Sequence, residues 1–339
     1  SLMPDAVTTE SPSALTPPLP KPRRWLRRLS IATLSLFLLA LVTGELIARF
    51  YLQLGDPPLF QPEQDMRYRM VPSSTYHRLG NTITYNRVSM RATPDIDEKK
   101  ATGERRILVI GDSVTNGGAA IGDRDLATTL LQDRLRSASR GPVVVMNASA
   151  GSWSPIQELA YLRRFGLFNA DTVVMVFNHE DALDDGAPRA LSADQPTRKP
   201  LLALEEVFLR FLPSAWNYYV MGGRSAAQAA AKPDAAPPKI QDSAIQSTRQ
   251  MVLLARAQGA KVAAVLHYSQ GELTTGPNPG LIALRQGLRE LDVPTIETAE
   301  PFRQATQRAL FPYRDPIHPS RTGQGPLLES LQSAVASAR

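Results

Sequence analysis

The stretch Arg105-Arg106-Ile107-Leu108-Val109-Ile110-Gly111-Asp112-Ser113 decides how this chain is read, because it joins a short apolar run to a turn. Short runs of aliphatic residues that end in such a turn are typical of buried strands. Four further runs follow along the chain, at residues 143–146, 172–176, 262–266 and 293–296. Strands that alternate with helices form βαβ units, which predict a parallel sheet covered on both faces.

Helices are expected between these strands, at residues 125–137, 155–165, 242–258, 279–291 and 325–336. We therefore predict an α/β protein with a three-layer α/β/α, flavodoxin-like fold and a five-stranded parallel sheet. This domain is expected to span residues 105–339, with an insertion at about 186–240 that interrupts the alternation and forms a lid or a membrane-facing flap.

Composition excludes several classes of protein. Of 339 residues, 43% are hydrophobic and 21% are charged, which fits neither a multi-span membrane protein nor a disordered chain. The net charge is +6, and residues 1–28 alone hold five basic and two acidic residues, so no nucleic-acid partner is expected. The absence of cysteine excludes disulfides, thiolate metal sites and a cysteine nucleophile.

The N-terminal region predicts a membrane anchor. Residues 1–28 are expected to form a disordered cytoplasmic tail, and residues 29–51 a transmembrane helix, since about 20 apolar residues span a bilayer. Arginines precede the apolar run, which places the following domain outside the cytoplasm. We expect a bacterial inner-membrane protein with one span and a periplasmic domain. A cleaved signal peptide is the alternative, although no small-x-small site follows the run.

Residues 52–104 are expected to form a stalk and an edge-strand extension. Two short candidate strands, at residues 82–85 and 88–91, lie there among prolines and glycines.

The turn after the first strand holds a candidate nucleophile. Ligands of open parallel sheets bind beyond the carboxyl ends of the strands, so a serine at position 113 would be exposed there. A helix cap formed by Asp112 or Ser113 is the simpler interpretation. A nucleophilic serine needs a base. Of the four histidines, His318 follows Asp315 by three residues, which lets the carboxylate hold one imidazole nitrogen while the other faces the serine.

Gly111-Asp112-Ser113 together with Asp315-Pro316-Ile317-His318 resembles the SGNH/GDSL hydrolase family. Residues 146–151, Met-Asn-Ala-Ser-Ala-Gly, resemble the family's second block, and residues 88–91 resemble the strand that precedes the domain in membrane-anchored relatives of polysaccharide and cell-envelope systems. The resemblance implies that Ser113 is the nucleophile, His318 the general base and Asp315 its orienting carboxylate. It implies an oxyanion hole that includes the N–H groups of Ser113 and Gly151.

The third block departs from the family pattern. The family has Gly-x-Asn-Asp, whereas residues 178–181 read Asn-His-Glu-Asp, so Glu180 stands where the asparagine donor is expected. An ionised glutamate would repel an oxyanion, and the loss of one donor costs about 3 kcal/mol. Asn178, two residues upstream, would point to the same side in an extended chain and supply the missing donor. A specialised site that uses His179 is the other explanation.

Further candidates for substrate contact are Trp153, His179, Glu180 and His267. Trp153 suits stacking on a sugar ring or core packing equally. Acidic residues 180–185 suit a solvated loop better than a cation site, so no metal is assigned, and no cofactor is expected.

We expect a serine esterase or acyltransferase that acts on acyl groups, chiefly O-acetyl, of an extracytoplasmic polysaccharide. The expected partners are this polysaccharide, the inner membrane through residues 29–51, and other envelope polysaccharide-synthesis or acetylation proteins. The alternative is a catalytically impaired SGNH-like module that binds glycan or scaffolds an envelope complex.

Overall fold

The computed structural model describes residues 24–192, 195–213, 216 and 239–339, in two compact units that divide between Leu46 and Ile47. The first unit contains helix α1 (Arg24–Leu46), whose sequence runs on into the π-helical turn η1 (Ile47–Tyr51) of the second unit. By length and composition, Arg24–Tyr51 is suited to cross a membrane. Most of the predicted tail, residues 1–23, lies outside the described residues.

The second unit is built on one parallel sheet, as predicted. Its five strands stand in the order β6-β5-β7-β8-β9, which is the order 2-1-3-4-5 of flavodoxin-like sheets. Their bounds are β5 Arg105–Gly111, β6 Val143–Ser149, β7 Thr172–Phe177, β8 Lys261–Leu266 and β9 Thr295–Glu297.

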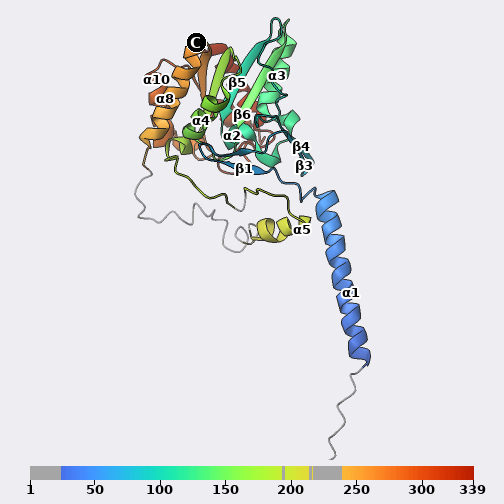
Figure 1. Ribbon diagram of the computed structural model, residues 1–339. Coiled ribbons are helices and arrows are strands. Elements are labelled where there is room, and N and C mark those ends of the chain that lie inside the picture. Colours follow the sequence, from blue (N-terminus) through green and yellow to red (C-terminus); the bar gives the residue numbers. More distant parts are fainter. Residues whose placement is uncertain (1–23, 193–194, 214–215, 217–238) are drawn as a thin grey trace, which may run out of the picture. The chain divides into compact units, whose positions relative to one another are not determined.

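Helices cover both faces of this sheet (Figure 1). On one face lie α3 (Ala127–Ala138) and α12 (Gln324–Ser337), and on the other lie α4 (Pro155–Phe165), α8 (Asp242–Ala257) and α10 (Pro279–Arg289). All five predicted helices are confirmed to within a few residues. Shorter helices that the apolar pattern did not show are α2 (Ser113–Asn116), α9 (Glu272–Thr275) and α11 (Ala299–Gln307), with single 3-10 turns at η2 (Gly118–Ala120) and η3 (Asp123–Asp125).

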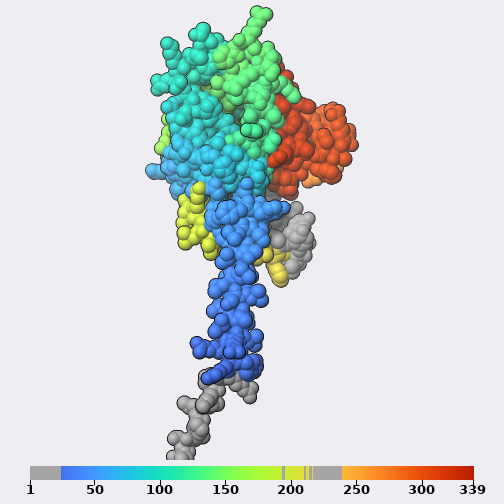
Figure 2. All heavy atoms as spheres, turned by 90° about the vertical axis from the view of Figure 1, so that its right-hand side faces the viewer, coloured from blue at the N-terminus to red at the C-terminus, as the bar shows by residue number. Residues whose placement is uncertain are grey.

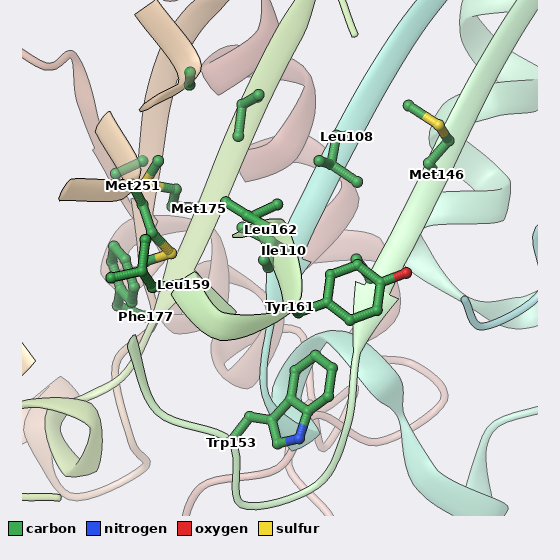
Figure 3. Close-up of a cluster of buried hydrophobic side chains, with 14 of the residues drawn as sticks. Leu108, Ile110, Met146, Trp153, Leu159, Tyr161, Leu162, Met175, Phe177 and Met251 are labelled. Atoms are coloured by element: carbon green, nitrogen blue, oxygen red, sulfur yellow. The ribbon is translucent and has the colours of Figure 1, made fainter. Parts of the chain in front are cut away.

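The side chains of β5 alternate between two cores, because successive residues of a strand point to opposite faces. Ile107 and Val109 pack in the core beneath α3 and α12. Leu108 and Ile110 pack in the larger core with residues of α4, α8 and α10, and Figure 3 shows them beside Leu162 of α4. Every residue of β5 after the first is buried, so the end of the strand, where Ser113 follows, is fixed by packing on both sides.

The region 52–104 is not a separate stalk. It forms two antiparallel hairpins, of β1 (Phe60–Glu63) with β2 (Arg67–Met70) and of β3 (Ser74–Arg78) with β4 (Asn81–Tyr85). Its buried apolar side chains join the larger core of the sheet, among them Met66, Tyr68, Met70, Ile83 and Met90. The region therefore packs within the same unit as the site.

Of the two strands predicted in this region, 82–85 is confirmed within β4 and 88–91 is wrong. Residues 86–90 form a turn in which Asn86 Oδ1 accepts hydrogen bonds from the N–H groups of Val88 and Met90. Arg91 makes a single bridge to Tyr85, and its N–H donates to the Asn147 carbonyl at the edge strand β6. An asparagine that caps its own turn outweighs the strand propensity of the following residues.

The interruption predicted at 186–240 is seen between β7 and α8. After η4 (His179–Ala182) the chain forms α5 (Ala203–Glu206), which continues as the π-helical turn η5 (Val207–Phe211). Residues 193–194, 214–215 and 217–238 lie outside the described residues, and with them the low-complexity stretch 226–238.

Candidate active site

Ser113 lies in the turn that joins β5 to α2, at the carboxyl edge of the sheet. Asp112 is the N-cap of α2, and its Oδ1 accepts a hydrogen bond from the Val114 N–H at 2.9 Å. At Gly111 a Cβ would lie only 2.4 Å from Thr115 Oγ1, so a larger residue would push the turn out of place. The turn thus holds the Ser113 hydroxyl at the edge where ligands of open α/β sheets bind.

A chain of hydrogen bonds joins Ser113 to His318 and Asp315. Ser113 Oγ lies 2.8 Å from His318 Nε2, and His318 Nδ1 lies 2.9 and 2.8 Å from Asp315 Oδ1 and Oδ2. Asp315 Oδ1 also accepts hydrogen bonds from the N–H groups of Ile317 and His318, at 3.1 and 2.8 Å. Burial opposes ionisation, but the hydrogen bonds from His318 and the backbone hold the pKa of Asp315 well below its usual range. A charged carboxylate orients the imidazole toward the serine, as Ser-His-Asp chemistry requires.

His267 supports the loop 315–318 from the core side and does not face the site. The side chain is completely buried, its Nε2 lies 2.7 Å from the Ile317 carbonyl oxygen, and its ring packs against Phe302 and Tyr313. Burial lowers the pKa of His267 to about 4, despite the hydrogen bond to Ile317. The expectation that it contacts substrate is therefore corrected, because the strand end turns this side chain inward.

Two backbone N–H groups at this site are available as hydrogen-bond donors. Among the residues that the structure describes, the N–H groups of Ser113 and Gly151 donate to no protein acceptor, and both residues line one cavity. Asn178, the predicted side-chain donor, is buried and otherwise engaged. Its Nδ2 donates to Asp112 Oδ2 at 2.7 Å, while its Oδ1 caps η4 by accepting from the Glu180 N–H at 2.8 Å. Because the Asn178 amide is held by these two hydrogen bonds, the expectation that it supplies the side-chain donor to the oxyanion is corrected.

The two other candidates from the third block, His179 and Glu180, lie in different places. Glu180 lines the cavity beside Ser113. His179 instead lies with its Nδ1 3.3 Å from Glu272 Oε2. Burial alone would lower the pKa of His179, but the hydrogen bond and charge of Glu272 raise it overall. The structure therefore brings Glu180, and not His179, to the nucleophile.

Trp153 is a core residue. It is only 3% exposed, its Nε1 donates to the Tyr68 carbonyl at 2.9 Å, and its ring centroid lies 5.4 Å from that of Tyr161. Figure 3 shows the Trp153 ring beside the Tyr161 ring. Although an edge of it borders the cavity, its faces are covered, so the expected stacking on a sugar ring is corrected.

The acidic residues that follow η4 are paired. Arg67 donates to both carboxylate oxygens of Asp184, at 2.8 and 2.5 Å, and Arg189 lies 3.3 Å from Asp185. Asp181 Oδ2 accepts from the Asn178 N–H at 2.7 Å. The carboxylates of Asp184 and Asp185 are thus paired with arginines.

A second acidic feature lies beneath the site. Asp112, Glu158 and Asp181 are all buried, and neither carboxylate oxygen of Glu158 has a hydrogen-bond partner. Burial raises the pKa of Asp112 to about 6, against the hydrogen bond from Val114, and burial with the charge of its neighbours raises the pKa of Glu158 and of Asp181 well above the usual range. Burial thus favours the neutral form of Glu158 and of Asp181.

Ser113 borders two cavities of different character. The larger has a volume of about 410 Å³ and polar walls that include Ser152, Ser154, Glu180 and Arg189. The smaller has a volume of about 130 Å³ and is lined by Gly151 with residues of the region 52–104, among them Pro57, Phe60, Met70 and Tyr85.

Three residues of the site did not stand out in the sequence. Arg314 lines the smaller cavity, donates to the Gly117 carbonyl at 2.9 Å and lies 3.5 Å from Asp315. Its position next to Asp315 in the sequence was the one signal that could have indicated Arg314 as a site residue. Ser152 and Arg189 line the larger cavity, and no sequence pattern distinguishes them from other loop residues.

Fold and site together define a class. The turn with Ser113 follows the first core strand, the Asp-x-x-His loop precedes the last helix, and the sheet has the order that the resemblance to the SGNH/GDSL hydrolases implies. The resemblance seen in the sequence is thereby confirmed at the level of fold.

No protein-family model and no curated protein matches this sequence. Similar solved structures include the acetylxylan esterase Axe2 from Geobacillus stearothermophilus, with 13% identity and a TM-score of 0.43 over 68% of this chain and 94% of that one. A two-domain esterase active on acetylated mannans has 10% identity and a TM-score of 0.45, over 69% of this chain and 50% of its own. A member of the lipolytic protein G-D-S-L family from Veillonella parvula has 10% identity and a TM-score of 0.39, over 69% and 99%.

Proposed function

We propose that this chain is a serine esterase or acyltransferase that removes an acyl group, chiefly O-acetyl, from a carbohydrate through an acyl-Ser113 intermediate. The observation that carries the proposal is the hydrogen-bond chain from Ser113 Oγ through His318 to Asp315, beside two N–H groups without a protein acceptor. Such a chain needs no rearrangement before reaction.

The steps follow from this geometry. His318 Nε2 takes the proton of Ser113 as Oγ attacks the ester carbonyl, and Asp315 stabilises the resulting imidazolium. The N–H groups of Ser113 and Gly151 would hold the oxyanion. When the C–O bond to the alcohol breaks, His318 returns the proton to the leaving alkoxide oxygen. Water or a glycan hydroxyl then attacks acyl-Ser113 with His318 again as base, which regenerates the serine.

The two cavities suggest where the acyl part and the alcohol part of the ester would bind. The cavity lined by Gly151 is the smaller of the two, with a volume of about 130 Å³. A short acyl chain fits there. The polar cavity of about 410 Å³ suits a hydroxyl-rich alcohol. Glu180 would accept hydrogen bonds from sugar hydroxyls in this role, since carboxylates are strong acceptors.

Location supports a polysaccharide as the substrate. We propose that Arg24–Tyr51 anchors the chain in a bacterial inner membrane with the catalytic unit in the periplasm, where envelope polysaccharides and the proteins that make or acetylate them are found. The anchored unit would then act on glycan close to the membrane surface.

A second candidate function is a glycan-binding or scaffold module with impaired catalysis. It is favoured by two observations: Asn178 is committed to Asp112 and η4, and a carboxylate, Glu180, lines the cavity beside the nucleophile. Negative charge near the oxyanion would slow acyl transfer.

The test uses the full chain in detergent micelles with p-nitrophenyl acetate and an acetylated xylan oligosaccharide. Ser113→Ala should abolish nitrophenol and acetate release, and a transient +acetyl mass should appear only on the unmodified chain. Ser243→Ala is the matched control, because Ser243 is exposed on α8 and lies in neither cavity beside Ser113. If the unmodified chain and both variants are equally inactive but still bind the oligosaccharide, the result would favour the binding module. Acetyl transfer to an added deacetylated oligosaccharide would distinguish the acyltransferase from the esterase.

A further inference from the structure

An exposed apolar surface lies on the second unit, away from the sheet. It is formed by η1 and by the α5–η5 segment with its flanks, and its exposed side chains include Phe50, Tyr51, Leu201, Phe208, Leu209 and Leu212. Tyr51 is 84%, Leu201 82% and Leu209 70% exposed. We call these six residues the apolar patch. Monomeric proteins in water rarely leave so many large apolar side chains together, so the patch requires a partner.

The two segments of the patch are joined to each other. Ala48 and Leu54 share a small buried cluster with Ala203. Arg49 Nη2 donates to the Leu201 carbonyl at 2.9 Å, and a Cβ on Gly55 would lie 3.3 Å from that of Ala203. Figure 2 shows the yellow surface of the 201–212 segment beside the blue surface near residue 50. The two segments that carry the patch therefore pack against each other.

The α5–η5 segment is apolar on both sides, because Ala203, Leu204 and Val207 belong to the small buried cluster on its inner side. Its inner side carries Glu206, which accepts hydrogen bonds from Arg78 Nη1 at 2.6 Å and from the Gly55 N–H at 3.2 Å. Arg78 is only 2% exposed. The outer side carries Phe208, Leu209 and Leu212. A helix that faces water carries mainly charged and polar side chains on its outer side, so this apolar outer side suits apolar surroundings.

We propose that the apolar patch lies in the interface of the lipid bilayer that holds the anchor. Along the chain, the patch begins where the candidate span ends, because Ile47–Tyr51 belong to the apolar stretch Arg24–Tyr51. Segments with an apolar outer face and aromatic residues are typical of helices that lie in the membrane plane. The proposal rests on the anchoring proposed above. It does not depend on whether the chain is an esterase.

Interfacial insertion has a consequence for the site. Glu206 on the inner side of the patch is paired with Arg78, which lines the smaller cavity beside Ser113. A patch that is fixed in the membrane surface therefore sets the direction in which this cavity faces. The membrane would present the site to glycan in one orientation.

The absence of cysteine makes a direct test simple. Single-cysteine full chains L209C and L212C are labelled with an environment-sensitive fluorophore and reconstituted in phosphatidylcholine–phosphatidylglycerol vesicles. Matched controls are L253C, whose native leucine is 56% exposed on α8, and L38C in the middle of α1, which reports on the anchor. Each sample is quenched with iodide from the water and with doxyl-labelled lipid from the bilayer.

The expected result is several-fold weaker iodide quenching at positions 209 and 212 than at 253, with strong quenching by doxyl lipid at 209, 212 and 38. Iodide quenching at 209 and 212 equal to that at 253 overturns the proposal. Protection from both quenchers also overturns it, since a protein would then cover the patch. Iodide access at position 38 overturns the anchoring and this proposal together. Hydrolysis of p-nitrophenyl acetate by the same samples tests the esterase function separately.

Discussion

Replacing Asp315 by asparagine should remove the activity while the fold persists. Asp315 Oδ1 accepts two backbone N–H groups, of Ile317 and His318, so the amide oxygen must keep that position. The amide nitrogen then takes the place of Oδ2, 2.8 Å from His318 Nδ1, and donates a proton there. The imidazole is forced to carry its proton on Nε2, where it cannot accept the proton of Ser113.

The magnitude follows from this tautomer. Trapping the base of a Ser-His-Asp site in the wrong tautomer costs about 10⁴ in rate, or about 5 kcal/mol of transition-state stabilisation. Asp315→Ala should cost a similar factor in rate, but it also removes two backbone hydrogen bonds at about 1 kcal/mol each. The two variants should therefore be alike in activity and differ in thermal stability.

The assay compares kcat/KM for p-nitrophenyl acetate and the melting temperature of the full chain in micelles. The expected result is an asparagine variant that melts with the unmodified chain, and an alanine variant that melts several degrees lower. An asparagine variant within tenfold of the unmodified kcat/KM would refute the role assigned to Asp315.

Three further predictions address the buried acids, the loop support and the acyl cavity. Because burial and Asp112 raise the pKa of Glu158, the stability that the fold has below about pH 4.3, where Glu158 is neutral, is lost as the pH rises. In thermal melts, E158Q should be more stable than the unmodified chain by about 1–3 kcal/mol at pH 8, and by less toward pH 5. A gain in stability that does not depend on pH would contradict this explanation. H267F leaves the Ile317 carbonyl without its hydrogen-bond donor, which should lower the free energy of unfolding by about 1–3 kcal/mol. It should also lower kcat more than it raises KM, and H267Q should recover part of both losses. Unchanged kinetics would show that His267 does not support the loop 315–318. M70A should enlarge the smaller cavity and raise the butyrate-to-acetate ratio of kcat/KM about tenfold; an unchanged ratio would place the acyl group elsewhere.

Much of the fold was predictable, because the apolar runs of the five core strands are local signals. Asp315 and His318 were predictable for the same reason, since they lie three residues apart in one loop. The role of region 52–104 was not, because its contacts are distant in sequence. Tyr68 donates to the Gly151 carbonyl, 83 residues away, and Tyr85 to Asn116. Short strands among prolines and glycines give little sign of such packing.

The side chains near the nucleophile show the same limit. Asn178 and Glu180 are both polar residues after a strand, and their spacing suggests that both face the ligand. The structure separates them, because Asn178 caps η4 and donates to Asp112, which leaves only Glu180 at the cavity. His267 and Trp153 likewise follow strands, yet both turn into the core.

The sequence by itself determined the fold class and pointed to the Gly-Asp-Ser turn and the Asp-x-x-His loop, since these patterns depend on neighbouring residues. Only the tertiary structure decided which groups meet at Ser113. His318 reaches it across 205 residues, and the smaller cavity is closed by hairpins that precede the sheet. Strand formation follows from local preference, whereas a site is made by contacts between distant segments that no local pattern encodes.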